Sequence, residues 1–384
     1  MDFSFSEEQT LLRNTIESFL QDNYGFDARK AIIKSEEGMS NKNWQQIAEL
    51  GLLGVPFSEA DGGLDFGPVE TMIVAEEFGK GLVVEPYIQT VVTCGGFLRR
   101  ASEEQRQEHL PKIISGEEIW AFAYAEPQGR FNLSDIKVSA SKKSSSLGRI
   151  PSNDAYILNG NKCVVSAAPW AQKLIVTART SGEQAEKEGI SLFVVDKSAP
   201  GVSTRDYKTV DGSMASEVLF ENVTLNSNSL IGEEGKAYPL IELVADETIA
   251  ALCAEAIGAM SVLNDATVEY CKTRKQFGQP IGKFQVLQHR MVDMFMQYEQ
   301  SVSMTYMVNL KLGEGESERT KAASGAKVQI CNASKFIGQN AVQLHGGMGM
   351  TDELNVGHYF KRLAMIETQF GNADHHLKKY SSVS

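Results

Sequence analysis

Residues 271–285, CKTRKQFGQPIGKFQ, carry the side chains best suited to binding a nucleotide. Arg274 offers a planar fork of N–H donors that matches a phosphate or pyrophosphate, and Phe277 offers a flat apolar face beside it. A basic helix end also complements the helix dipole without binding any ligand, so the residues alone leave both interpretations open. Gly278 and Pro280 then interrupt the helical pattern, which places the cationic cluster at a corner of the chain.

A second segment, residues 343–349 (QLHGGMG), combines paired glycines with polar side chains. Paired glycines let a backbone approach a ligand closely, because no Cβ stands in the way. The segment is not a dinucleotide fingerprint, since G-x-G-x-x-G is absent and no strand pattern precedes it. A helix end followed by a loop is the alternative interpretation. We interpret His345 as a donor beside a ligand rather than as a base.

Glu255 is a carboxylate in the otherwise apolar run LCAEAIGAM. Burying a carboxylate there is costly unless it is paired or kept neutral. Two interpretations stay open: a general base with a raised pKa, and a structural acid paired to a buried Arg, His or backbone donor.

The sequence Asp374-His375-His376 does not predict a metal site. Adjacent residues on a helix point about 100° apart, so they rarely share one ion. No acidic partner follows four residues later, and we interpret the segment as a solvated polar face.

The composition excludes several classes of protein. With 37 basic and 49 acidic side chains the formal charge is −12, so we expect no binding to nucleic acid or to an anionic membrane. The five cysteines are scattered without C-x-x-C spacing, which predicts buried thiols in a reducing compartment. The first residues lack a signal-peptide pattern and no long apolar run occurs, so we expect a soluble, cytoplasmic protein.

Hydrophobic periodicity divides the chain into helical and β-rich stretches. The first stretch has helical spacing and begins with a capping-box signal, in which Ser6 precedes Gln9 by three residues. Short β-rich runs such as KLIVTA and ISLFVV follow, and Asn159-Gly160 predicts a hairpin turn between two of them. Helical spacing resumes near Ala237, and its apolar stripes predict a bundle, because such helices bury their stripes against one another.

A chain of 384 residues is also long enough for more than one domain. We therefore predict an α+β fold with an N-terminal all-helical domain over residues 1–118, a central small antiparallel β domain over 119–233, and a C-terminal four-helix bundle over 234–384.

This order of domains, with R-K-Q-F-G-x-P-I-G-x-F-Q at 274–285, QLHGGMG at 343–349 and LGLLGVPFSEADGG at 50–63, resembles the acyl-CoA dehydrogenase family. The resemblance covers essentially the full chain and implies FAD as the cofactor. It implies that residues 274–285 reach the FAD of a neighbouring chain, and that 343–349 contact its pyrophosphate and adenosine. The residues to which it assigns these FAD contacts are Arg274, Gln276, Phe277, Gln343, Gly346 and Gly347.

The wall beside the flavin ring departs from the family pattern. Ala125 stands where the family usually has Thr or Ser before Glu-Pro, which leaves only backbone donors for the flavin. Val164 replaces an aromatic residue, while Ser166 keeps the hydroxyl that the resemblance places near flavin N5. Residues 128–135 replace the usual G-S-D, on a loop that in the family touches the thioester side of the substrate.

The reaction implied by the resemblance is removal of an α proton from an acyl-CoA by a carboxylate, with hydride transfer from the β carbon to flavin N5. Phe370 stands where most members of the family carry that Glu, and Asn372 stands where they tend to have Thr and is expected to contact the cofactor. Thr248 stands at the other position that the family uses for the base.

The chain thus resembles a divergent, bacterial-type member whose base has migrated, with Glu247 and Glu255 as catalytic candidates. Glu247 lies one residue, or about 100° of helical rotation, from Thr248, and needs a loosened first turn to point inward. An exposed acid at a helix start, favoured by the dipole, is the alternative interpretation of Glu247.

Two functional hypotheses follow. The first is an acyl-CoA dehydrogenase for a dicarboxylic, branched or ring-bearing acyl group, active in fatty acid or steroid side-chain β-oxidation. The second is a non-catalytic, FAD-binding subunit that assembles with a related chain supplying the base. Both imply a homotetramer or heterotetramer, and the resemblance implies an electron-transferring flavoprotein as the electron acceptor.

Overall fold

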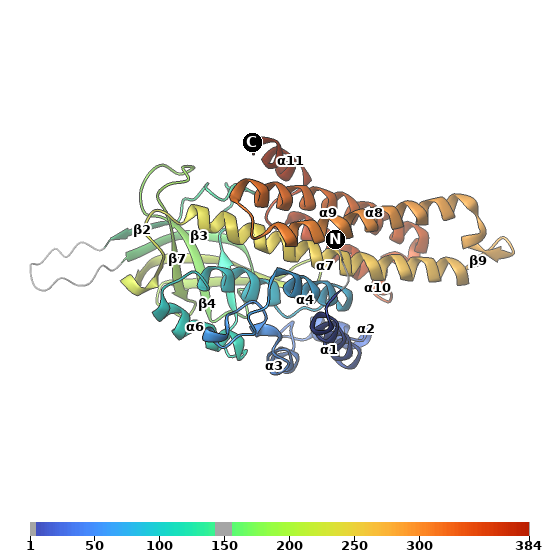
Figure 1. Cartoon of the computed structure of the whole chain (residues 1–384), viewed down its shortest axis with the longest axis horizontal. Helices are drawn as coiled ribbons and strands as arrows, with labels where there is room; N and C mark the ends of the chain where they lie inside the picture. Colours follow the sequence, from blue (N-terminus) through green and yellow to red (C-terminus); the bar gives the residue numbers. More distant parts are fainter. Residues whose placement is uncertain (1–4, 143–155, 384) are drawn as a thin grey trace, which may run out of the picture. The chain divides into compact units, whose positions relative to one another are not determined.

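The computed structural model describes residues 5–142 and 156–383. Along the chain, N-terminal helices are followed by strands and then by long C-terminal helices, which confirms the predicted α+β class (Figure 1). By their contacts the residues form two compact units: the first combines Met1–Met39, Phe66–Val84 and Asp246–Ser384, and the second combines Ser40–Asp65 and Glu85–Ala245. The domain ranges 1–118, 119–233 and 234–384 stay a prediction.

The first unit is mainly helical in its described residues. Its N-terminal helix begins with the predicted capping box, in which the Ser6 side chain accepts from Gln9 N and the Gln9 side chain accepts from Ser6 N. The helices of this unit are α1 (Glu7–Asn23), α2 (Phe26–Lys34), α4 (Pro68–Gly81), most of α7 (Tyr238–Thr273), α8 (Gln285–Lys311), α9 (Glu316–His345), α10 (Asn355–Thr368) and α11 (Ala373–Ser382).

Two glycines let α4 and α7 cross closely. A Cβ on Gly79 would lie 2.0 Å from the carbonyl oxygen of Glu255, and one on Gly258 would lie 1.9 Å from that of Glu76. Neither helix tolerates a side chain at its crossing point, because the obstructing atoms belong to backbone. The crossing therefore fixes where Glu255 on α7 lies relative to α4.

The described residues of the second unit build an eight-stranded sheet and short helices. The strand order is β6-β7-β3-β2-β4-β5-β8, and β1 pairs with β4 in parallel while most other ladders are antiparallel. The strands are β1 (Trp120–Ala123), β2 (Ser139–Lys142), β3 (Tyr156–Ser166), β4 (Lys173–Arg179), β5 (Ile190–Asp196), β6 (Val202–Lys208), β7 (Met214–Leu225) and β8 (Leu230–Ile231). The helices are α3 (Asn41–Glu49), α5 (Gly95–Leu98) and α6 (Glu103–Ile114), with a π-helix over Ile88–Cys94.

The predicted hairpin turn at Asn159-Gly160 is wrong. β3 runs without interruption through both residues, and the ladder with β7 shifts register between Leu158 and Gly160. Gly160 has φ +127°, and a Cβ there would lie 2.9 Å from the Cα of Val138, so glycine serves a β-bulge and a close backbone approach. The same dipeptide favours both structures, and long-range pairing with β7 decides between them.

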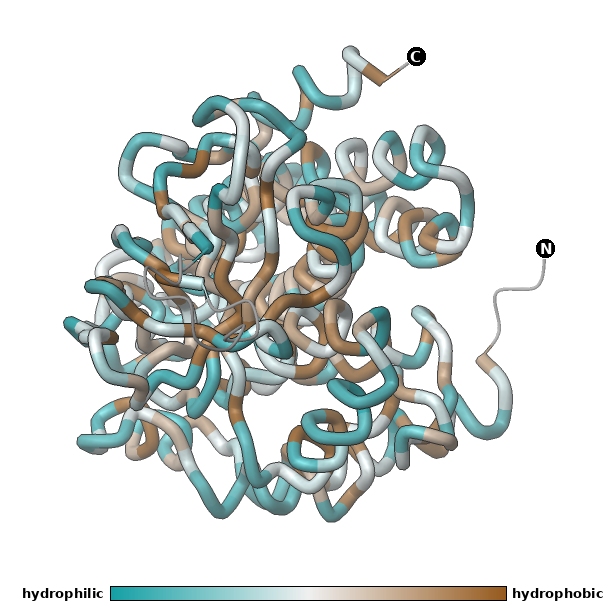
Figure 2. The backbone as a smooth tube through the Cα atoms, turned by 90° about the vertical axis from the view of Figure 1, so that its left-hand side faces the viewer, coloured by the Kyte–Doolittle hydropathy of each residue, from teal (hydrophilic) through white to brown (hydrophobic). Residues whose placement is uncertain are grey.

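Hydrophobic residues lie mainly within helices and strands, and many of the turns at the rim of the view are hydrophilic (Figure 2). Four of the five cysteines are buried as predicted, and Cys163 is half-buried. None of the described helices combines the length and apolarity that a membrane span requires.

Candidate functional site

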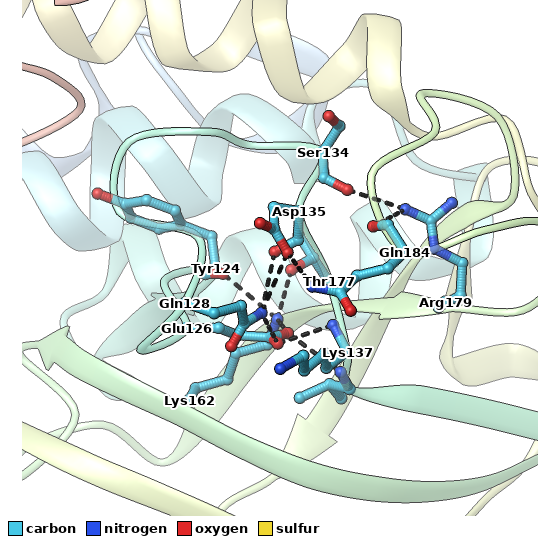
Figure 3. A network of polar contacts seen from close by, with 11 residues as sticks. Tyr124, Glu126, Gln128, Ser134, Asp135, Lys137, Lys162, Thr177, Arg179 and Gln184 are labelled. Atoms are coloured by element: carbon cyan, nitrogen blue, oxygen red, sulfur yellow. Dashed lines mark hydrogen bonds and ion pairs between the residues drawn. The ribbon is translucent and has the colours of Figure 1, made fainter.

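A buried ion pair joins the loop after β1 to strand β3 in the second unit (Figure 3). Lys162 Nζ lies 2.7 Å from Glu126 Oε1, and the exposed fractions of the two side chains are 0% and 1%. Lys162 also donates to Thr177 Oγ1 at 2.8 Å and to the Tyr124 carbonyl at 3.3 Å. These hydrogen-bond partners of the Lys162 ammonium thus lie on strand β4 and on the loop that carries Ala125.

The surroundings of Glu126 keep the pair ionised. Burial alone would raise the pKa of the Glu126 carboxyl, but the Lys162 charge and hydrogen bonds from Gln128 Nε2 and the backbone N–H of Lys137 and Val138 lower it below its usual value. Burial lowers the pKa of Lys162 to about 8, against the opposing effect of Glu126. At neutral pH both groups therefore carry charge, and each depends on the other.

This pair holds together the two segments predicted to face a flavin ring. The Cys163 N–H donates to the Ala125 carbonyl at 2.9 Å, so the loop after β1 lies directly against β3. Ala125 and Ser166 are both half-buried, and no hydrogen bond joins the Ser166 hydroxyl to another described residue. The structure thus brings the predicted flavin wall into one place, with a backbone and a hydroxyl group left to contact a ligand.

Backbone strain is concentrated around Ser166. Val164 and Ala167, on either side of it, have φ values of +50° and +66°, a region that side chains other than glycine rarely adopt. A β-branched residue such as Val164 is a clear outlier there. Strain of this kind persists where surrounding contacts enforce it, and it is typical of ligand-contacting segments.

Arg179 joins two loops of the second unit through hydrogen bonds to their backbone. Its guanidinium donates to four backbone carbonyls, those of Ser134 (2.9 Å), Gln184 (2.8 Å), Glu186 (2.9 Å) and Glu188 (2.6 Å). These bonds tie the altered loop 128–135 to the turn between β4 and β5. Sequence reasoning missed both Arg179 and the Glu126–Lys162 pair. The sequence signal that could have found them is a charged residue inside an apolar strand pattern, as for Lys162, or at the end of one, as for Arg179.

The cationic segment forms an exposed hairpin at the end of α7 and α8 (Figure 1). Strand β9 (Lys275–Gln276) pairs with β10 (Gln279–Pro280) around Phe277 and Gly278, whose φ values are +51° and +80°. Phe277 is 91% exposed, and Arg274 and Gln276 are also exposed. The Phe277 ring meets the Phe284 ring edge-on, with centroids 6.2 Å apart, and most of its surface stays exposed. A large aromatic side chain so exposed in a strained turn fits a contact with a neighbour's cofactor.

The glycine motif lies at the end of α9 and stands against the helix that carries the hairpin. His345 stacks on Tyr270 of α7 with ring centroids 4.3 Å apart, and its Nδ1–H donates to the Ala341 carbonyl at 2.8 Å. Burial lowers the pKa of His345. The ring therefore links two helices, whereas a donor to a ligand was expected from the sequence.

Gln343, Gly346 and Gly347 are exposed at this helix end. No atom of the described residues lies within 4 Å of a Cβ built on Gly346 or Gly347. The backbone of Gly346, with φ +62° and ψ −144°, itself favours glycine, whereas no contact within the chain requires glycine at Gly347. Open space at both positions fits the predicted close approach of a pyrophosphate to the backbone.

Replacing Phe277 by Asn separates the two possible roles of the hairpin. Asn-Gly is the preferred pair for a two-residue turn with both φ values positive, so the folding stability should be unchanged or slightly higher. If Phe277 contacts FAD, affinity for FAD should fall at least tenfold. Isothermal titration with FAD, together with thermal unfolding, measures both effects. Leu11→Asn, at another exposed apolar position, should leave FAD affinity unchanged, and an equal loss in both variants would contradict the assigned contact.

Glu255 is a paired acid in the structure. Arg362 of α10 donates to it from Nε at 2.5 Å and from Nη2 at 2.7 Å, and the Glu255 side chain is 7% exposed. This bidentate geometry matches one of the two interpretations that the sequence left open. One guanidinium engages both carboxylate oxygens, so part of the lone-pair capacity of Glu255 is already used within the chain.

Glu247 does not lie in the first turn of a helix. α7 begins at Tyr238, so residues 246–248 lie in a regular helix interior and the loosened first turn expected from the sequence is absent. Glu247 is half-buried rather than exposed, while Thr248 is buried. Its neighbour Asp246 is fully buried, with Arg319 Nε at 3.1 Å and Thr320 Oγ1 at 3.0 Å.

The segment where the family carries its usual Glu is also organised by contacts within the chain. Phe370 has φ +55°, and its carbonyl accepts from His376 Nε2 at 3.0 Å. Asn372 caps α11 by accepting from His375 N at 3.0 Å, which leaves its amide N–H groups for the predicted cofactor contact. His376 is 1% exposed, so the solvated polar face predicted for 374–376 is wrong at this residue. Its ring bonds the Phe370 carbonyl and so spans the turn before α11.

His376 should make the stability of the first unit depend on pH. Burial, with the nearby Lys327 charge, lowers its pKa to about 3, whereas an unfolded histidine titrates near 6.5. Between these values the unfolded chain binds more protons, so the free energy of unfolding should fall by about 2 kcal/mol from pH 7 to pH 5. Urea unfolding at both pH values measures this. His376→Gln should flatten the pH dependence, and the exposed His289→Gln should not. Equal slopes in the two variants would contradict the assignment.

The chain is similar to known proteins over most of its length, and the matched ranges include the site residues. Family models described as the N-terminal, middle and C-terminal domains of acyl-CoA dehydrogenase match residues 6–117, 121–223 and 246–380. Mitochondrial isovaleryl-CoA dehydrogenase from Pongo abelii is 30% identical over 376 residues, which are 96% of this chain and 86% of that protein.

Solved structures agree in fold and length. A variant of the Tcur3481-Tcur3483 steroid ACAD has a TM-score of 0.86 at 26% identity, covering 98% of this chain and 97% of the other. PigA with FAD and proline has a TM-score of 0.89 at 26% identity, covering 99% of this chain and 98% of the other. The similarity therefore includes both units rather than one motif.

Proposed function

The chain belongs to the acyl-CoA dehydrogenase family, and from this premise we propose that it catalyses the α,β-dehydrogenation of an acyl-CoA with a branched or ring-bearing acyl group. Membership confirms the predicted enzyme class, an oxidoreductase, and FAD as the cofactor. The match of all three family models in order is the observation that carries the reaction type. The acyl group, the base and the assembly are the parts that we propose.

The residues present fit FAD. The exposed Gly346 and Gly347 give a backbone that a pyrophosphate can approach, and Arg274 on the hairpin supplies a guanidinium for the same charge. Ser166 offers a hydroxyl on the strained end of β3, and the Ala125 loop stands beside it. Bound FAD supplies the acceptor for the hydride that leaves the β carbon.

The chain must also remove the α proton, and we assign this step to the Glu247 carboxylate. Glu247 is half-buried. It directly precedes Thr248, which stands at the second position that the family uses for its base. Glu255 is the less suitable candidate, since Arg362 holds both of its oxygens. In this step a side chain of the chain itself acts on the substrate: a carboxylate removes the α proton in a site that excludes water.

A second candidate function has its own support. Phe370 and Thr248 stand at the two positions of the family's base, and Glu255 is engaged with Arg362. A chain with retained FAD contacts and no available base would be a non-catalytic subunit that pairs with a related chain. The similarity to the Tcur3481-Tcur3483 steroid ACAD favours this candidate, because two gene products are named in that protein.

The choice of acyl group rests on the altered loop 128–135 and on the relatives. Isovaleryl-CoA and 2-methylacyl-CoA dehydrogenases act on branched acyl groups by their names, and the steroid ACAD is named for a ring-bearing one. In this chain the loop is held rigid by Arg179 and by the Gln184–Asp135 hydrogen bond of 2.6 Å. A rigid, altered loop on the substrate side suits an acyl group of fixed shape.

Steady-state assays with an artificial electron acceptor test this proposal. Isovaleryl-CoA, 2-methylbutyryl-CoA, a steroid side-chain CoA ester, butyryl-CoA and octanoyl-CoA form the panel. A kcat/KM at least tenfold higher for a branched or ring-bearing thioester supports the proposed substrate class. A preference for straight chains would contradict it. A tetramer, an electron-transferring flavoprotein as acceptor and a cytoplasmic location complete the proposal.

A further inference from the structure

Strand β3 contains a second irregularity, close to Ser166. In the ladder with β7, Lys162 pairs with Val218 and Val165 pairs with Ser216. Glu217 alone therefore lies opposite both Cys163 and Val164, which defines a β-bulge. Val164 takes φ +50° within this bulge and is 49% exposed, so neither glycine flexibility nor burial explains its conformation.

Two side chains from neighbouring strands hold the bulge. Tyr207 of β6 pairs with Ala215, so it lies diagonally across from Glu217 on the same face of the sheet. Its hydroxyl donates to Glu217 Oε1 at 3.2 Å. Burial and Glu217 raise the pKa of Tyr207, and the backbone of Val164 lies close enough to the same hydroxyl to oppose this shift. One phenol thus joins the strained residue to the carboxylate opposite it.

We infer that Tyr207, with Glu217, is a positioning device that keeps Val164 in its left-handed conformation and thereby sets the place of Ser166 toward the flavin. The inference rests on the proposed function, because it takes the end of β3 as the flavin wall. Neither residue was singled out from the sequence. Both act through the backbone of β3 and touch no reacting atom.

The chain contains a matched control for this contact. Tyr156, at the other end of β3, donates from its hydroxyl to Glu234 Oε2 at 2.9 Å. Tyr156→Phe and Tyr207→Phe each remove one hydroxyl from a tyrosine–glutamate hydrogen bond in the same sheet. Only the second removes a hydroxyl that lies beside the bulge.

Titration with FAD and the visible absorption spectrum of the bound flavin test the inference. Tyr207→Phe should weaken FAD binding roughly five- to tenfold and alter the flavin band, because the polar contacts of the phenol beside the bulge are lost. Tyr156→Phe should leave both unchanged. Adding Val164→Gly to Tyr207→Phe should recover part of the affinity, since glycine adopts φ +50° without support.

Equal affinities and spectra for the two tyrosine variants would overturn the inference while leaving the proposed function intact. A wild-type chain that binds no FAD would contradict the proposed function, and this inference with it. The two failures are therefore distinguishable in one set of titrations.

Discussion

Replacing Lys162 by Met should lower the free energy of unfolding of the second unit by about 3–5 kcal/mol, because Glu126 would be left as an uncompensated buried charge. The same change removes the contact between β3 and the Tyr124 carbonyl, so FAD affinity should fall as well. Chemical unfolding of the FAD-free chain and titration with FAD measure the two effects separately.

Two controls separate a lost ion pair from a lost side chain. Lys236→Met breaks an exposed pair with Glu233 and should have no measurable effect. The double variant Glu126→Leu, Lys162→Met removes both buried charges and should be more stable than Lys162→Met alone. If Lys162→Met proved as harmless as Lys236→Met, the pair would not hold the flavin wall together.

Replacing Glu247 by Gln should slow flavin reduction by the substrate roughly 10²–10⁴-fold, the usual effect of removing a general base. FAD binding should persist, because no assigned FAD contact is changed. Stopped-flow absorbance under anaerobic conditions measures the rate. Glu269→Gln, on the exposed face of the same helix, should retain the wild-type rate.

Glu255→Gln distinguishes the second candidate base. This change breaks the bidentate pair and leaves Arg362 with a neutral partner, so its main effect should be on stability. A rate loss in Glu255→Gln that exceeds the loss in Glu247→Gln would transfer the role to Glu255. Wild-type rates in both variants would exclude both as the base.

Local signals allowed much of the fold to be predicted. The Ser6–Gln9 capping box and the change from helical to β periodicity each depend on residues within a few positions of one another. The Asn159-Gly160 turn failed because its outcome depends on pairing with β7, which is distant in sequence. Pairing between distant strands overrides turn propensity.

The candidate site was predictable only in part, for a similar reason. Motifs identified Arg274, Gly346 and Ser166, whose contexts are local. Glu126 and Lys162 are separated by many residues, and only the fold brings them to 2.7 Å. His376 was misassigned because a charged-looking helix face gives no sign that a carbonyl and a serine enclose the ring.

The most direct test of this account is anaerobic titration of the purified chain, expressed alone and loaded with FAD, with the preferred acyl-CoA thioester. We predict that the flavin absorbance bleaches in wild type and that bleaching is lost in Glu247→Gln. Bound flavin that no thioester in the panel reduces would contradict a self-sufficient dehydrogenase. It would instead identify a subunit whose base comes from a partner chain.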